Sequence, residues 1–468
     1  MRNFFVFLFF PIFLFSQEKI TTTSADQKEI YLTVYNSNRA LITEEREVDF
    51  PFSGKCFLNY VDVPSTIMSQ TLSFNVKSGK PLNLLEQNYE YDLLSPQKLL
   101  EKYLGKEVIL VQNVMENNTT VLKKTKAKLL STNNGTVWEA EGKILSNPTY
   151  SYLEFPTVPE NLYAKPTLVI SLEGEKGKRL IETSYLATGL NWICDYVLSL
   201  NEKGNIGNLT GWVTLTNNSG KTYKDASLKL IAGDIKTLER KDVGRYYEEA
   251  VVLKAQAPSF EEKAFFEYHL YTMTRKTTIK DNQQKQIELL EGKNIPIERE
   301  YLLTGEKWYY TQRYADGQTQ KIEVLLKFKN EEKNNLGIPL PKGTVRVYQR
   351  DTDGSSQFIG EDLIDHTPKD EMIKLSVGKA FDVVAERKQK DFKSISNCVY
   401  EMEYEIVLRN HKEEDINVKV IEPIGGDWTI LSSSHPYEKD QAFQVIFNVK
   451  VSKDGESKLV YRVRVKYC

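Results

Sequence analysis

The acidic loop that begins at Asp351 has the residue types of a calcium site. Asp351 and Asp353 alternate with other residues before Gly354, as the carboxylates of Ca²⁺-binding loops do. The loop lacks a third ligand before the glycine and a Glu twelve positions from its start, so Glu361 and Asp362 would complete a site only if the chain folded back. The sequence favours the alternative that Asp353-Gly354 forms a hairpin turn between two strands.

Trp428 is a candidate for ligand stacking because it follows the turn Gly425-Gly426-Asp427, which Glu422 flanks on the other side. An exposed Trp428 could stack on a sugar ring or anchor a partner, with Asp427 as its polar neighbour. The alternative is that Trp428 covers the end of a sandwich core. The sequence favours this packing role because aromatic residues dominate β cores.

His269 is a candidate base or proton sensor. It lies in an alternating aromatic run, on the face opposite Tyr268 and Leu270. Because no nucleophile stands at a recognised spacing, a half-buried, hydrogen-bonded His269 is the favoured interpretation. The sequence also contains no Gly-x-Ser-x-Gly elbow, Gly-rich phosphate loop or metal-ligand cluster. We therefore predict no catalytic residue, no metal site and no cofactor.

The four cysteines, Cys56, Cys194, Cys398 and Cys468, stand far apart in the sequence. Their spacing does not resemble that of a zinc site. In an oxidising compartment one or two pairs could form disulfides, and the sequence does not choose among the pairings. The alternative is four independent thiols that are buried as small apolar residues.

The composition is that of an ordinary globular protein rich in strands. The 468 residues include 62 basic and 64 acidic side chains, so the chain is nearly neutral. Near-neutrality argues against nucleic acid, which calls for a basic stripe, and gives no polybasic patch for anionic lipid. The length allows two to four domains. The 26 tyrosines and 21 phenylalanines favour β-structure.

Residues 1–16 have the pattern of a secretory signal: Arg2, about a dozen apolar residues, and Ser16 as the predicted cleavage position. The run is shorter than the roughly 20 residues that a membrane-spanning helix needs. An uncleaved N-terminal anchor is the alternative. Beyond this segment no apolar run approaches membrane length. We therefore predict an exported protein with no integral membrane span in the mature chain.

The remaining elements predict a mainly β, multi-domain protein. A helix is expected from Ser95, the N-cap before Pro96, to Gly105. Turns and short alternating strands fill the rest, and Lys236–Glu262 is a charged stretch that we predict as a mobile loop. The predicted segments are the signal peptide 1–16, a β module 17–94, the helix with a small barrel-like β insert 95–166, and a C-terminal antiparallel β-sandwich 167–468.

Five segments, 184–196, 211–220, 228–234, 266–271 and 343–362, together resemble a bacterial family of the cell envelope. The resemblance is to the C-terminal domain of unknown function of mucoidy-inhibitor-A-like envelope proteins, over roughly residues 180–468. It implies a bacterial protein of the periplasm or cell surface, with no established reaction and no agreed catalytic residues. Many relatives carry a long coiled coil before this domain, whereas here Ser95–Leu104 is one short helix.

Two hypotheses about function follow. The first is a non-catalytic envelope protein that binds a protein or glycan partner through the loops of a rigid sandwich. The second is an envelope hydrolase that acts on glycan or peptide through carboxylates around Asp351–Asp362 or near Asp427. Two carboxylates in one cleft, one with a raised pKa, would favour the hydrolase. Carboxylates that point into water would favour the binding protein. The oligomeric state stays open.

Overall fold

The computed structural model describes residues 18–90, 92–116, 119–159, 162–233, 260–313 and 317–468. The predicted signal segment 1–16 and most of the predicted loop 236–262 lie outside these residues. The last residues of that predicted loop instead begin strand β17, Phe260–Phe265. The described chain is mainly β with one α-helix, which confirms the predicted fold class. None of its helices is long and apolar enough to cross a membrane.

The chain forms two compact units, each made of separate segments. The first unit comprises Met1–Asn191, Thr216–Lys229 and Arg275–Gln284; the second comprises Trp192–Leu215, Leu230–Thr274 and Lys285–Cys468. The boundary that we predicted at residue 167 therefore falls inside the first unit. The reason is strand pairing, because β12 (Thr167–Gly174) pairs with strands from the first 90 residues of the chain.

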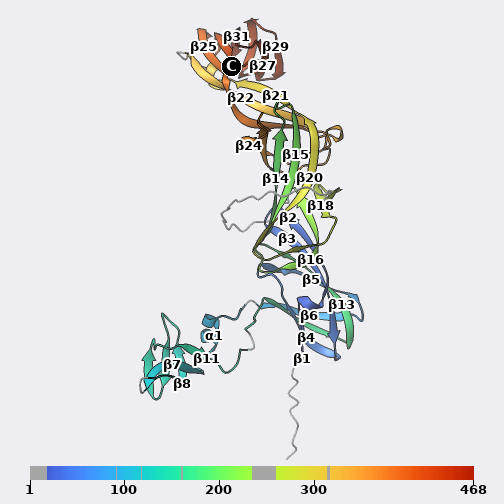
Figure 1. The fold of residues 1–468 in the computed structure, drawn as a ribbon, viewed down its shortest axis with the longest axis vertical. Coiled ribbons are helices and arrows are strands. Elements are labelled where there is room, and N and C mark those ends of the chain that lie inside the picture. The colour runs from blue at the N-terminus through green and yellow to red at the C-terminus, as the bar shows by residue number, and fades with distance from the viewer. Residues whose placement is uncertain (1–17, 91, 117–118, 160–161, 234–259, 314–316) are drawn as a thin grey trace, which may run out of the picture. The chain divides into compact units, whose positions relative to one another are not determined.

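Two sheets build the main body of the first unit (Figure 1). In the smaller sheet the strand order is β1-β4-β12-β6, and in the larger one β16, β2, β3, β13 and β5 are neighbours in that order. Period-two alternation turns one face of each strand to the core. The bounds are β1 Glu18–Thr22, β2 Gln27–Tyr35, β3 Arg39–Phe50, β4 Gly54–Val61, β5 Ile67–Ser78, β6 Leu82–Glu90, β13 Gly177–Ala187 and β16 Tyr223–Ala232.

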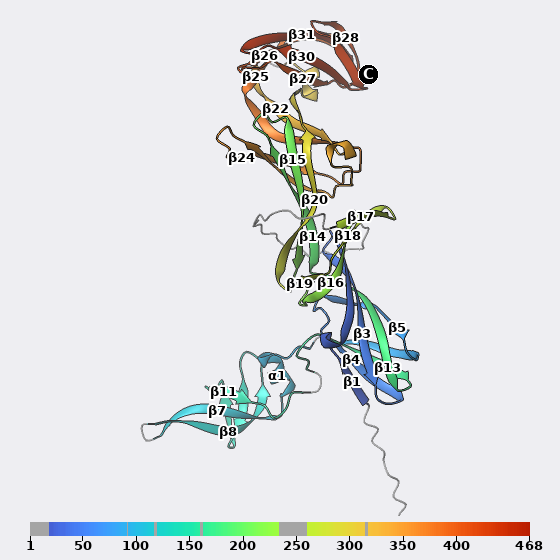
Figure 2. The ribbon, with the colours of Figure 1, turned by 45° about the vertical axis from the view of Figure 1, so that its right-hand side comes forward.

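The one α-helix of the described chain lies beside a five-stranded sheet (Figure 2). Side chains from both form a small hydrophobic core. Helix α1, Pro96–Lys102, begins where predicted, with the Ser95 hydroxyl accepting a hydrogen bond from the Lys98 N–H. Tyr103 and the buried Trp138 belong to this core. The order β10-β9-β8-β7-β11 is an open sheet rather than the expected barrel-like closure. The bounds are β7 Glu107–Glu116, β8 Thr119–Ser131, β9 Val137–Ala140, β10 Lys143–Ser146 and β11 Tyr152–Glu154.

The second unit contains most of a five-stranded sheet, β20-β15-β14-β23-β24, and a nine-stranded sheet, β28-β31-β26-β25-β22-β21-β27-β30-β29, that curls until it nearly closes. Among the pairs of these sheets whose register is described, β14 with β23 and β21 with β27 are parallel, and β23 with β24 and the other pairs of the nine-stranded sheet are antiparallel. The bounds are β14 Leu190–Leu200, β15 Ile206–Asn217, β20 Gln283–Pro296, β21 Glu298–Thr304, β22 Gln318–Lys329, β23 Gly343–Arg350, β24 Ser356–Ile364, β25 Met372–Ser396, β26 Val399–Asn410, β27 Ile416–Pro423, β28 Asp427–Ser433, β29 Tyr437–Gln441, β30 Gln444–Val451 and β31 Gly455–Lys466. Outside these sheets, β18, Tyr268–Met273, pairs with β17, and β19, Thr277–Ile279, is a strand of the first unit that pairs with β16.

A disulfide joins Cys398, in the turn between β25 and β26, to Cys468 after β31. Of the pairings that the sequence left open, this one forms, and Cys56 and Cys194 are buried free thiols. The bond closes a loop with a sequence separation of 70. It ties the nine-stranded sheet together at the end where β26 and β31 pair.

Removing this disulfide is expected to destabilise the second unit. In the chain-entropy account, a loop with a sequence separation of 70 is worth about 4 kcal/mol. The double variant Cys398→Ser/Cys468→Ser should therefore unfold at clearly lower urea concentration than the oxidised protein. Added reductant should shift the wild type to the same midpoint and leave the variant unchanged. Equal midpoints with and without the bond would contradict the expectation.

Candidate functional site

The acidic loop that we weighed as a calcium site is a hairpin turn between β23 and β24. The Gly354 N–H donates to the Asp351 carbonyl at 2.9 Å, and Asp353 Oδ1 accepts from the Ser355 N–H at 2.7 Å. Further along β24, Glu361 pairs with Arg346, and Asp362 accepts a hydrogen bond from the Ser376 N–H. No group of three or more His, Cys, Asp or Glu side chains in the described ranges is placed to hold a metal ion.

The aromatic and histidine candidates have structural partners of their own. Trp428 is only 6% exposed and belongs to the core of the second unit, with its indole N–H donating to the Ala442 carbonyl at 2.8 Å. This is the packing role that the sequence favoured. Its neighbour Asp427 is exposed at the start of β28. His269 Nδ1 lies 2.8 Å from Glu262 Oε1 on the β17–β18 hairpin, which fits the hydrogen-bonded interpretation.

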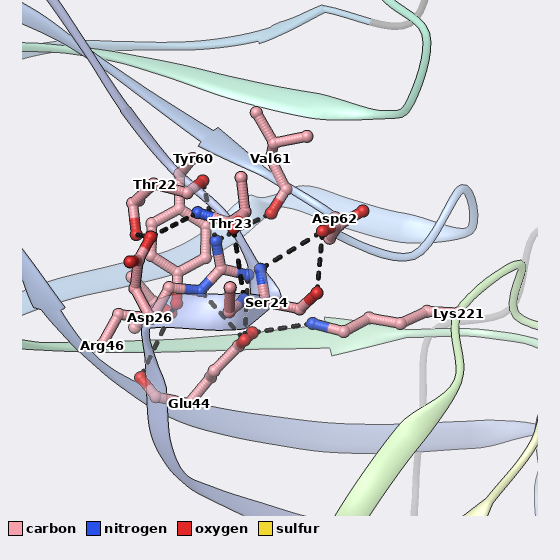
Figure 3. A network of polar contacts seen from close by, with 12 residues as sticks. Thr22, Thr23, Ser24, Asp26, Glu44, Arg46, Tyr60, Val61, Asp62 and Lys221 are labelled. Atoms are coloured by element: carbon pink, nitrogen blue, oxygen red, sulfur yellow. Dashed lines mark hydrogen bonds and ion pairs between the residues drawn. The ribbon is translucent and has the colours of Figure 1, made fainter.

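A fully buried charge cluster in the first unit was not among the predicted sites (Figure 3). Glu44 Oε1 accepts hydrogen bonds from Arg46 Nε and Nη2 at 3.0 and 2.9 Å, and its Oε2 accepts one from Lys221 Nζ at 2.8 Å. Glu44 and Arg46 are completely buried, and Lys221 is 6% exposed. Figure 3 shows Lys221 and Arg46 reaching the carboxylate from different directions. Three ionised side chains therefore meet in the core.

Strand β3 places two of these side chains inside because of its alternation. Glu44 and Arg46 follow Ala40 and Ile42 on the inward face of β3, and Val48 continues that face. The sequence contained this signal, because positions 44 and 46 have the same two-residue spacing as the apolar positions 40, 42 and 48. Charged residues are rarely fully buried, so the residue types at positions 44 and 46 favour a solvent-facing prediction over a core one.

Arg46 is fully occupied by its surroundings. Its Nη1 donates to the backbone carbonyls of Thr22 and Val61 at 3.1 and 2.8 Å. Its guanidinium carbon lies 3.6 Å from the ring centroid of Tyr60, a cation–π contact. Tyr60 is itself held by a 2.9 Å hydrogen bond from the Thr183 hydroxyl. Arg46 therefore joins the two sheets of the unit and is a structural member of the cluster.

The loop between β15 and β16 fixes the position of Lys221. The buried Asn217 donates from Nδ2 to the Lys221 carbonyl at 2.8 Å, and its Oδ1 accepts from the Ser219 N–H and hydroxyl. Ser219 in turn lies 2.9 Å from the Tyr223 hydroxyl. Gly220, at φ +81°, makes the turn where a Cβ would collide with Ser65. These contacts fix the conformation of the loop and hold the backbone of Lys221 in place.

The electrostatics of the cluster favour an ionised Glu44. Burial alone would raise the pKa of Glu44, but the ion pairs with Lys221 and Arg46 outweigh it and lower that pKa below the usual value. Burial also lowers the pKa of Lys221, and the nearby Arg46 guanidinium acts in the same direction against the attraction of Glu44. Of the three side chains in the cluster, Lys221 is therefore the one whose charged form is least favoured by its surroundings.

A cavity of about 510 Å³ lies beside the cluster, and Lys221 forms part of its wall. At its edge Asp62 pairs with Lys165 at 2.5 Å and accepts hydrogen bonds from the Ser24 N–H and hydroxyl. These contacts join three connecting segments of the chain: Ser24 follows β1, Asp62 follows β4, and Lys165 precedes β12. The polar lining includes Ser24, Asp62, Lys165, Lys221, Thr222 and Lys224.

No protein-family model matches the chain, and no curated protein matches it. The cavity and the cluster beside it are therefore interpreted from their own chemistry. Loops that border a pre-organised pocket on a rigid sandwich are suited to binding.

Proposed function

We propose that the protein is an exported, non-catalytic protein of the bacterial cell envelope that binds a protein or glycan partner through loops of its first-unit sandwich. The observation that carries this proposal is the cavity beside Glu44, Arg46 and Lys221. Its lysine is held by a buried hydrogen-bond network, which is the arrangement expected of a pre-organised binding site. The partner would enter at the exposed Lys224 side of the lining.

We further propose a location in the periplasm or at the cell surface, and a relationship to the mucoidy-inhibitor-A-like envelope proteins. The signal-like segment 1–16 supports export, and the segments that resemble the family support the relationship. The disulfide between Cys398 and Cys468 also supports export, because disulfides persist mainly in oxidising compartments.

The carboxylates at the β23–β24 turn favour a binding protein over the alternative hydrolase. Asp351 and Asp353 are exposed at the turn. Hydrogen bonds from Ser355 lower the pKa of Asp353, whereas a general acid in a hydrolase needs a raised pKa. Glu361 is engaged with Arg346. These carboxylates therefore have structural partners instead of the paired arrangement that hydrolysis requires.

Site-specific cross-linking in intact bacteria tests the proposal. A photoreactive amino acid is placed at Lys224, in the cavity lining, or at Lys178, which is exposed on the same unit and lies outside the lining. Adducts are then identified by mass spectrometry. We expect one reproducible protein or glycan adduct from position 224 that position 178 does not give. No adduct from position 224, or the same adducts from both positions, would count against the proposal.

A further inference from the structure

The charge cluster beside the cavity contains more positive than negative charge. Arg46 and Lys221 carry two positive charges, and Glu44 is the one carboxylate that both contact. All three side chains are nearly or completely withdrawn from water. A buried charge is costly unless a partner compensates it. Since both oxygens of Glu44 are already used, one buried cation is left without a carboxylate of its own.

Lys221 is the cation of the cluster that also belongs to the cavity lining. An ammonium group has three hydrogen-bond donors, and Glu44 is the one acceptor that Nζ contacts among the described residues. Arg46, by contrast, is engaged by Glu44 and two backbone carbonyls. The surplus positive charge and the unused donors therefore belong to the residue that lines the cavity.

Two further lysines extend this positive character along the lining. Lys165 and Lys224 line the same cavity as Lys221, whereas Asp62 is the acidic residue of the lining and already pairs with Lys165. Lysine ammonium groups bind phosphate and carboxylate as point charges, without the fixed geometry that arginine imposes. The lining therefore has the chemistry of a site for an oxyanion.

We propose that this cavity binds a carboxylate or phosphate group of the ligand, with Lys221 as its central contact and Lys165 and Lys224 at its rim. This inference rests on the proposed binding function and adds the chemical class of the group that is recognised. The anion would provide the compensating charge that the cluster lacks. A neutral ligand of the same size would leave the positive charge of Lys221 without this compensation.

Calorimetric titration of the purified full-length protein tests the inference with three probes: D-glucuronate, D-glucose 6-phosphate and D-glucose. We expect at least one of the charged sugars to bind about tenfold or more tightly than glucose, because hydrogen bonds to charged groups are stronger than neutral ones. The better of the two charged probes shows whether the group is a carboxylate or a phosphate. Equal affinity for glucose and both charged sugars, or no binding of either charged sugar, would overturn the inference.

Matched variants locate the binding to the cavity. Lys221→Met should abolish the preference for charged probes, and Lys224→Gln should reduce it severalfold. Lys178→Gln removes the same charge outside the cavity and should leave it unchanged. If Lys221→Met does not fold, Lys224→Gln and Lys165→Gln carry the test. Equal losses in Lys224→Gln and Lys178→Gln would show unspecific attraction and overturn the inference.

The result can be separated from that of the cross-linking experiment. A specific adduct at position 224 together with sugar binding that does not depend on charge would support the binding function. It would overturn the inference that the cavity recognises a carboxylate or phosphate. Lysine-dependent binding of a charged sugar without any adduct in cells would support the anion and count against the proposed partner.

Discussion

Glu44→Gln is expected to lower the free energy of unfolding of the first unit by about 3–5 kcal/mol, the usual loss when one partner of a buried ion pair is removed. Glutamine keeps the size of the side chain but not its charge. Arg46 and Lys221 would then lie in the core with no carboxylate between them. Hydrogen exchange of the β3 and β13 peptides during urea titration measures the loss where it arises.

Glu47→Gln is the matched control, because Glu47 lies on the exposed face of the same strand with a side chain that is 48% exposed. Its effect should stay within about 0.5 kcal/mol, as is usual for the surface. The difference in the free energy of unfolding between the wild type and Glu44→Gln should become smaller at acid pH. The pKa of Glu44 is lower in the folded than in the unfolded protein, so its stabilisation is present above the usual 4.5 and is lost as pH falls through the folded pKa. A gap that does not change with pH would contradict this account.

Lys221→Met makes the complementary comparison within the same prediction. Glu44 keeps Arg46 as its partner in this variant, and an apolar side chain replaces a desolvated ammonium. The free energy of unfolding should therefore change much less than in Glu44→Gln. A loss as large as that of Glu44→Gln would mean that Lys221 is needed for the fold and is not a surplus cation.

Short patterns in the sequence correctly predicted those elements whose conformation is set by residues close to one another in the chain. The N-cap Ser95 with Pro96 marks the start of α1, and Asp353-Gly354 marks the β23–β24 turn. In both, the backbone conformation is decided by residues within a few positions. The mainly β fold class follows from the same short-range alternation.

The buried cluster could not be assembled in this way. Glu44 and Lys221 are 177 positions apart, and only the pairing of distant strands brings them together. The same holds for the predicted boundary at residue 167, because β12, which begins at Thr167, pairs with β4 and β6 from the other side of that boundary. A charged residue on a strand is normally predicted to face solvent. Here Glu44 and Arg46 alternate in register with the apolar Ile42 and Val48, which places all four side chains on the same, inward face of the strand.

In the second unit, Arg387→Met should have an effect of similar size. Arg387 Nη2 lies 2.7 Å from Glu422 Oε1, and both side chains are at most 1% exposed. The other oxygen of Glu422 accepts a hydrogen bond from Tyr310, whose hydroxyl also lies 2.7 Å from that of Tyr461. Without the guanidinium, a buried carboxylate is left with the hydrogen bond from the Tyr310 hydroxyl but no opposite charge. The expected loss is about 3–5 kcal/mol, measured by urea unfolding.

Arg409→Met is the matched control, since Arg409 pairs with Glu386 in the same sheet but is 33% exposed. An exposed ion pair of this kind contributes about 0–1 kcal/mol. The double variant Arg387→Met/Glu422→Met should recover most of the loss of the single one, because two apolar side chains need no compensating charge. A double variant as unstable as Arg387→Met would show that the Tyr310 and Tyr461 hydroxyls, and not the ion pair, hold this part of the core together.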